Sequence, residues 1–314
     1  MPTFDLPTLP AESPEESGSH PPRNRTRALL TLCRPYQWLK NPIPITLSLI
    51  SVPHWTFSAL IRLFTIAALF TLASIAVYIL NDILDRDRDR QHPKKRYRPI
   101  AAGEITPRAG WILFVTVCVL LCAGVGLTPL ERGWLVCVYA VLNLAYSFRL
   151  KHIPLVEAFV VATGFVLRML AGYAAIASRP SPWLLISVLA GCLLLVLGKR
   201  RGELADGAAK HRPALGGYSV QLLDQLILMS ATLSAVGYML FLPSSVSLSH
   251  DPAVFILLSV SCAVFAIFRY LQLLVVGGGG GDPSRTLIRD RPLIVSGVVW
   301  TTIVVVFHTG LPVN

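Results

Sequence analysis

Charged residues are scarce in this chain of 314 residues: they make up 14% of the sequence, whereas 54% of the residues are apolar. Soluble domains carry about 25% charged residues, so this chain has too little charge to cover itself in water. The long apolar runs also contain almost no Lys or Arg. With a mean hydropathy of +0.60, these absences exclude a soluble globular enzyme and a conventional nucleic-acid binder, and they predict a polytopic membrane protein.

Metal-ligand spacing is also missing among the six cysteines, most of which lie inside apolar runs. Cys118 and Cys122 are one helical turn apart and could form a thiol pair, but two packed small side chains are the favoured interpretation. The sequence therefore predicts neither disulfides nor a zinc site.

Nine apolar segments follow a proline-rich tail, residues 1–27, which is predicted to be disordered and cytoplasmic. Each segment is close to the ~20 residues that a helix needs to cross ~30 Å of hydrocarbon. Continuous apolar runs of this kind favour helices over a β-barrel. The segments are 43–58, 63–81, 110–128, 131–148, 153–176, 182–198, 222–244, 252–275 and 292–310. The sequence thus predicts an all-α bundle of nine transmembrane helices in a single domain, residues 28–314.

The positions of the cations give this bundle an orientation. If the first helix starts in the cytoplasm, the inner loops are 82–109, 149–152, 199–221 and 276–291. The tail, the entry segment with Arg34 and Lys40, and these loops then carry 23 of the 28 Lys and Arg, and the outer connections carry three. Cytoplasmic loops are enriched in Lys and Arg. We therefore expect the tail inside, the C-terminus outside, and a net charge of +11 that attracts anionic lipid and phosphate.

The loop after the second segment carries an acidic motif. If the helix continues past residue 81, Asn81, Asp82, Asp85 and Asp89 share an arc of about 100° over two turns. Clustered carboxylates repel one another unless a cation lies between them, and hard oxygen ligands suit Mg²⁺. Lys95 and its basic neighbours could serve the remaining phosphate charge. The competing interpretation is a solvated helix end with internal ion pairs, which fits Asp87 on the opposite side.

The pattern Asn81-Asp82-x-x-Asp85-x-x-x-Asp89 resembles the first aspartate-rich motif of the UbiA superfamily of intramembrane prenyltransferases. The resemblance covers Arg34 to Trp300. It implies a nine-helix bundle whose cytoplasmic-side cavity binds a diphosphate through Mg²⁺. It also implies that Asp82, Asp85 and Asp89 act in catalysis and, with Asn81, hold the metal.

A second acidic motif, usual after the sixth span of these prenyltransferases, is replaced here by a run that contains Lys199, Arg200 and Glu203. Direct binding of phosphate by the Lys and Arg side chains fits this run better than a second metal site. The stretches 34–41, 95–103, 146–151 and 290–293 resemble the phosphoribosyltransferase branch of the superfamily. That branch joins phosphoribosyl pyrophosphate (PRPP) to a polyprenyl (decaprenyl) phosphate and releases pyrophosphate.

Charged residues inside spans are costly in hydrocarbon and tend to face the bundle interior. Glu157 and Arg168 project from one face of the fifth segment, about 16 Å apart, so each needs another partner. Both a buried ion-pair network and a phosphate-facing Arg168 remain open. The glycine run 277–281 lacks the residues of a phosphate-binding loop and is predicted to be a flexible connector.

The favoured function is Mg²⁺-dependent phosphoribosyl transfer at the cytoplasmic face of a bacterial inner membrane, with PRPP and a lipid phosphate from the bilayer as partners and no nucleic acid. Prenyl transfer to an aromatic acceptor and non-enzymatic lipid transport are the alternatives. The candidate substrate-binding residues are Asn81, Lys95, Arg98, Tyr146, Lys151, Arg168, Lys199, Arg200 and Glu203.

Overall fold

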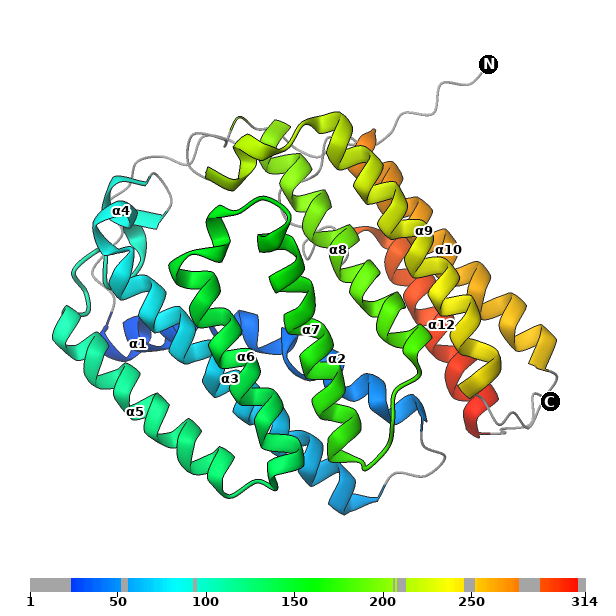
Figure 1. Ribbon diagram of the computed structural model, residues 1–314, viewed down its shortest axis with the longest axis horizontal. Coiled ribbons are helices and arrows are strands. Elements are labelled where there is room, and N and C mark those ends of the chain that lie inside the picture. The colour runs from blue at the N-terminus through cyan, green and yellow to red at the C-terminus, as the bar shows by residue number, and fades with distance from the viewer. Residues whose placement is uncertain are drawn as a thin grey trace.

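Helices make up all the regular structure of the described part of the chain, which covers residues 24–51, 56–92, 95–205, 207, 213–245, 252–276 and 289–309 of this computed structural model. The all-α prediction is therefore confirmed for these residues. Most of them belong to long helices that lie side by side (Figure 1). These are α3 (Phe57–Leu84), α5 (Pro107–Gly126), α6 (Leu130–Phe148), α7 (Val156–Ala175), α8 (Pro182–Ala205), α9 (Val220–Ser245), α10 (Pro252–Val275) and α12 (Arg291–Thr309).

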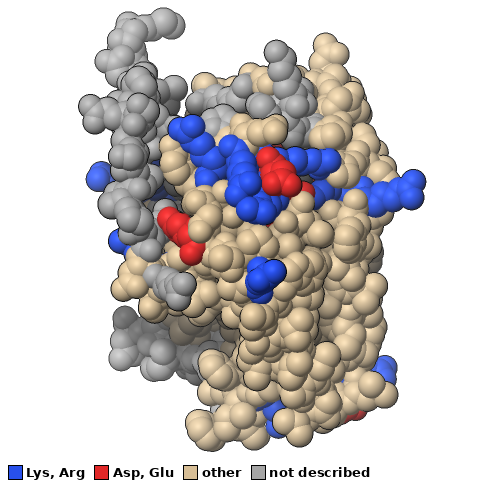
Figure 2. All heavy atoms as spheres, turned by 90° about the vertical axis from the view of Figure 1, so that its left-hand side faces the viewer, with Lys and Arg blue, Asp and Glu red and all other residues tan. Residues whose placement is uncertain are grey.

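Six of these helices, α3, α5, α7, α8, α9 and α10, are long and apolar enough to cross a membrane. Their outward faces expose large apolar side chains, among them Val115 and Val119 on α5 and Phe268 on α10. So much exposed apolar surface suits lipid and not water. In Figure 2, charged side chains gather at one end of the molecule, and most of the surface below them is uncharged. The chain is therefore a multi-pass membrane protein.

The first apolar segment, 43–58, is not the continuous helix that the sequence predicts. It begins as α2 (Pro42–Thr46) and continues as the short 3-10 helix η2 (Leu47–Ser51), while residues 52–55 lie outside the described part of the chain. Pro42 and Pro44 lie in the first turn of α2, where a missing N–H costs nothing. They therefore fit the start of this segment and do not account for the change of helix type at Leu47.

A short helix, α1 (Arg25–Cys33), begins inside the range predicted as a disordered tail. Ala28 and Leu32 on this helix are fully buried in a cluster that includes Ile75 and Ile79 of α3. The burial of these side chains explains why α1 is ordered from Arg25 onward. Residues 1–23 and the glycine run 277–281 lie outside the described residues.

The segment α2 lies directly against α7, and Gly172 makes this approach possible. A β-carbon at Gly172 would collide with the main-chain atoms of Ile45 on α2. Ile45 is itself buried in the core formed by α3, α6 and α7. The missing side chain thus lets a broken helix pack into the bundle.

Substitution of Gly172 by alanine is expected to lower the free energy of unfolding by about 1–3 kcal/mol, because the added carbon overpacks a rigid main-chain contact. Thermal unfolding in detergent measures the loss. Gly126→Ala is the matched control, since nothing lies within 4 Å of a β-carbon there. Equal unfolding temperatures for the two variants would contradict the packing argument.

Polar contacts tie the helix ends together at both ends of the bundle. At one end the Arg62 guanidinium of α3 donates to the Ala175 carbonyl of α7 at 2.6 Å. Near the end of α10, Arg269 donates to Asp290, which directly precedes α12, at 2.8 Å. The Arg269 guanidinium holds the pKa of the Asp290 carboxyl below its usual value. The acidic motif lies at the end opposite Arg62, where α3 finishes.

Candidate active site at the end of α3

The acidic motif spans a bend between two helices. Asn81 and Asp82 lie in the last turn of α3, and Asp85 is the junction at which α4 (Arg86–Gln91) begins. The backbone N–H of Asp85 donates to the Asn81 carbonyl at 2.8 Å, and that of Asp89 donates to the Asp85 carbonyl at 2.8 Å. The predicted single helix through residue 89 is therefore interrupted at Asp85, and the motif does not present all its side chains on one face.

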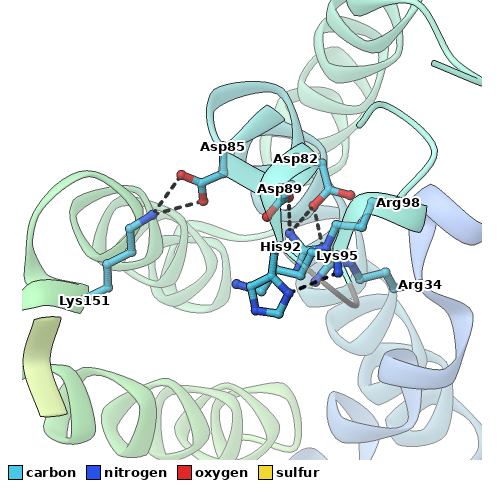
Figure 3. A network of polar contacts seen from close by, with 8 residues as sticks. All are labelled: Arg34, Asp82, Asp85, Asp89, His92, Lys95, Arg98 and Lys151. Carbon is cyan, nitrogen blue, oxygen red and sulfur yellow. Dashed lines mark hydrogen bonds and ion pairs between the residues drawn. The ribbon is translucent and has the colours of Figure 1, made fainter. Parts of the chain in front are cut away.

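Two carboxylates of the motif converge on one arginine (Figure 3). Arg98 Nη1 lies 3.1 Å from Asp82 Oδ1 and 2.7 Å from Asp89 Oδ2. A second guanidinium, that of Arg34, reaches the same Asp82 oxygen at 2.5 Å. Asp82 and Asp89 are only 2% and 3% exposed. The competing interpretation, a solvated helix end with internal ion pairs, is therefore wrong about solvation for these two residues, although both form the ion pairs that it includes. It holds for Asp87, which is exposed and pairs loosely with Arg90.

The third carboxylate turns the other way. Asp85 faces Lys151, which lies between α6 and α7 in the short helix η4 (Leu150–His152), with Nζ 3.2 Å from Asp85 Oδ2. Lys95 lies on the rim in η3 (Lys95–Tyr97), and its backbone N–H donates to His92 Nδ1 at 3.3 Å. The structure thus brings Lys151, Lys95 and Arg98 to the acidic motif, as the sequence predicts.

The donor set of this cluster suits a hard divalent cation. Carboxylate oxygens are the ligands that Mg²⁺ prefers, and two of the carboxylates already surround one cationic nitrogen of Arg98. As the side chains are placed, no group of three His, Cys, Asp or Glu among the described residues could hold a metal. In this conformation the positions next to the carboxylates are filled by guanidinium and ammonium groups.

The basic run on α8 forms a second cluster. Arg200 donates to both oxygens of Glu157 on α7, at 2.6 Å and 2.9 Å, and to Glu203 at 2.7 Å. Arg200 and Glu157 are buried, and Lys199 is half exposed with its Nζ 3.9 Å from Glu203. The buried ion-pair interpretation of Glu157 is confirmed.

Tyr146, near the end of α6, lies close enough to interact electrostatically with Arg200. It is half-buried, so α6, α7 and α8 all contribute to this second cluster. Glu157 begins α7 a few residues after Lys151, which places the two clusters at the same end of the bundle. The structure therefore gathers both predicted groups of charges at one pole.

Arg168 lies deeper, in the middle of α7. Its guanidinium donates to Asn41 at 2.8 Å, to the Tyr139 hydroxyl at 2.7 Å and to the Gly164 carbonyl at 2.7 Å. The rings of Phe70, Tyr139 and Phe165 lie within 6 Å of it. All the hydrogen bonds found for Arg168 among the described residues go to neutral groups, so its charge has no carboxylate partner there. The alternative of a buried ion pair is not supported for Arg168.

Arg34 is the residue of this site that sequence reasoning missed. It is the C-cap of α1, in the left-handed region with φ 51°, and Pro35 prevents the helix from continuing. The side chain reaches Asp82 while its guanidinium stacks 4.7 Å from the centre of the Tyr78 ring. The available signal was that Arg34 precedes a proline on the predicted cytoplasmic side, but nothing in the sequence indicates that its side chain contacts Asp82.

Comparison with known proteins agrees with this architecture. The family model described as UbiA prenyltransferase family matches residues 41–275. The decaprenyl-phosphate phosphoribosyltransferase of Mycobacterium tuberculosis is 34% identical over 304 residues, 91% of this chain and 96% of that protein. The enzyme of the same name from Corynebacterium glutamicum is 30% identical over 91% of this chain and 88% of its own length. A UbiA homolog from Archaeoglobus fulgidus, solved bound to GPP and Mg²⁺, superimposes with a TM-score of 0.65 at 14% identity, covering 88% and 97% of the two chains.

Proposed function

The chain belongs to the UbiA prenyltransferase family, and on this premise we propose that it transfers 5-phosphoribose from PRPP to a polyprenyl phosphate such as decaprenyl phosphate, with release of pyrophosphate. Two relatives that align over most of their length carry the name of this activity. The observation that carries the choice of reaction is Arg200, which fills the centre of the α8 cluster with a cation between Glu157 and Glu203. This buried cation supports the cationic interpretation of the run on α8 over a second metal site.

The acidic cluster is proposed to take the pyrophosphate end of PRPP. Asp82, Asp85 and Asp89, with Asn81, would hold Mg²⁺, which when bound neutralises charge on the departing pyrophosphate. The bond between the ribose C1 and the pyrophosphate oxygen breaks, and an oxygen of the lipid phosphate forms the new bond from the opposite face, so C1 is inverted. The carboxylates stabilise the positive charge that develops at C1.

The acceptor needs no strong general base, because a polyprenyl phosphate is already an anion at neutral pH. Lys151 and Lys199 are partly exposed, and with Lys95 and Tyr146 they are proposed to line the path of the phosphate groups. Arg168, whose charge meets only neutral partners among the described residues, is proposed to attract a phosphate from the deep side of the site. Arg200 and Glu203 act as positioning residues, since the Arg200 guanidinium is engaged by two carboxylates.

The proposed setting is a bacterial inner membrane, with the N-terminus and the acidic cluster in the cytoplasm and the C-terminus outside. The Lys and Arg distribution of the sequence supports this orientation. We further propose a single domain over residues 28–314, in which the eight long helices and the broken segment 42–51 form nine membrane segments around a cytoplasmic-side cavity. The isoprenoid tail of the acceptor would then extend laterally into the bilayer.

A direct assay tests the reaction. Purified protein in detergent receives Mg²⁺, labelled PRPP and a polyprenyl phosphate, and the organic phase is examined for labelled lipid. We expect labelled lipid only when both substrates and the divalent cation are present, and none after chelation with EDTA. Turnover of an isoprenyl diphosphate with an aromatic acid, without any labelled lipid from PRPP, would instead assign aromatic prenyl transfer. Inactivity in both assays would favour lipid transport.

A further inference from the structure

The acidic cluster carries its own set of counter-ions. Three positive groups face its three carboxylates: Arg34 on Asp82, Arg98 on both Asp82 and Asp89, and Lys151 on Asp85. The cluster is therefore neutral as a whole. Figure 3 shows that Arg34 and Arg98 reach it from one side and Lys151 from the other. Each of the three cations comes from a different segment of the chain.

The two arginines lie where a metal would have to bind. Asp82 Oδ1 accepts from two guanidiniums at 2.5 Å and 3.1 Å, and Asp89 Oδ2 accepts from Arg98 at 2.7 Å. Both carboxylates are almost fully buried, whereas the side chains of Arg34 and Arg98 are 17% and 28% exposed. A cation from solvent therefore meets the arginines before it meets the oxygens. Such a cation must displace a charge-assisted hydrogen bond to reach Asp82 Oδ1 or Asp89 Oδ2.

Adding a bare divalent cation to this neutral group would leave it with two excess positive charges in a partly buried place, which is unfavourable. A divalent cation that arrives on a diphosphate brings the compensating negative charge with it. The displaced guanidiniums then have phosphate oxygens within reach, and the planar fork of arginine is well suited to them.

We propose that Arg98 and Arg34 are exchangeable counter-ions. They pair with Asp82 and Asp89 and compete with a bare metal ion for these carboxylates, and they transfer to the diphosphate when a metal–diphosphate complex binds. This inference rests on the proposed function only in that the ligand is a diphosphate with a divalent cation. It assigns Arg34 to the site, and it predicts that both arginines lower the affinity for the free metal ion and raise the affinity for the diphosphate. The free metal competes with them, and the diphosphate is held by them.

Binding measurements on the full chain in detergent test this exchange without any turnover. Binding of Mn²⁺ alone is followed by electron paramagnetic resonance, and binding of labelled inorganic pyrophosphate is measured at saturating Mn²⁺. For Arg98→Gln we expect Mn²⁺ alone to bind about tenfold more tightly and pyrophosphate about tenfold more weakly than in the unmodified protein. Arg34→Gln should change both affinities in the same directions. Arg88→Gln removes an equal charge from an exposed position on α4 and should leave both affinities within about twofold.

The sign of the first change decides the proposal. If an arginine only stabilised the loop around α4, its replacement would weaken the binding of both ligands. Unchanged or weaker binding of Mn²⁺ to the Arg98 and Arg34 variants therefore overturns the exchange. If neither variant folds, the unmodified protein decides, because exchange requires Mn²⁺ to bind more weakly alone than with pyrophosphate. Neither measurement uses PRPP or a lipid acceptor. If the two affinities shift in opposite directions but no labelled lipid forms from PRPP, only the proposed function is rejected. If labelled lipid forms but the affinities do not shift in opposite directions, only the exchange is rejected.

Discussion

Replacement of Asp82 by asparagine is expected to reduce phosphoribosyl transfer by about a hundredfold or more while the protein stays folded. The Asp82 carboxylate is 2% exposed and accepts from Arg34 and Arg98. Asparagine keeps the shape and one acceptor oxygen but removes the negative charge with which Asp82 would balance the divalent cation. The protein should remain folded because Arg98 still forms its ion pair with Asp89 and Arg34 still contacts the ring of Tyr78. The measurement is labelled lipid formed per minute, beside the unfolding temperature.

Asp87→Asn is the matched control for this experiment. Asp87 belongs to the same acidic run, but its side chain is 86% exposed and its contact with Arg90 is long, at 3.8 Å. Exposed pairs of this kind contribute little to stability, so near-normal turnover is expected. If Asp82→Asn retained more than about a tenth of the activity, Asp82 would not be a metal ligand.

The positions of most helices follow from the sequence, because apolar runs of about 20 residues have one stable form in a membrane. The segment predicted at 252–275 is α10 with the same bounds, and the segment at 182–198 is the first part of α8. Pro182 and Pro252 begin these helices, where a missing N–H costs nothing. The failure at 43–58 shows the limit of this argument, because hydropathy measures how apolar a run is and not whether it forms one continuous helix.

The partners of the site residues could not be predicted from helical spacing. Asp82 lies 48 residues from Arg34, and Glu157 lies 43 residues from Arg200. Helical periodicity shows which side chains share a face, but it does not show which faces meet. The sequence did predict that Glu157 and Arg168 each need a separate partner. It could not show that Glu157 finds a cation on α8 while Arg168 finds only neutral groups among the described residues.

The largest expected effect on stability is that of Arg200→Met. Glu157 is fully buried and accepts two hydrogen bonds from Arg200, at 2.6 Å and 2.9 Å. Methionine fills much of the same volume but removes both of these hydrogen bonds and the positive charge that Arg200 places beside the Glu157 carboxylate. Removing one partner of a buried ion pair costs about 3–5 kcal/mol, because the remaining charge is desolvated and unpaired. Thermal or denaturant unfolding of the purified variant in detergent gives the loss.

The neighbouring residue provides a control of equal chemistry. Arg201 pairs with Asp224 of α9, whose side chain is 43% exposed, and also donates to the Leu274 carbonyl of α10 at 3.1 Å. Water can solvate Asp224 when its partner is lost, so Arg201→Met is expected to cost about 1 kcal/mol or less. The two substitutions remove the same charge from adjacent positions of α8. A large difference between them therefore measures burial of the carboxylate partner and not the loss of an arginine from the helix.

The double variant Glu157→Met/Arg200→Met separates the cost of an unpaired charge from the value of the pair. Apolar replacement of a whole buried ion pair is often neutral or stabilising, so most of the stability lost in Arg200→Met should return. Glu203 keeps Lys199 nearby in this variant. If Arg200 positions the site, the double variant will be stable and still deficient in turnover. If stability does not return, Arg200 packs against more than its two carboxylates, and the ion pair with Glu157 is not the main source of its contribution.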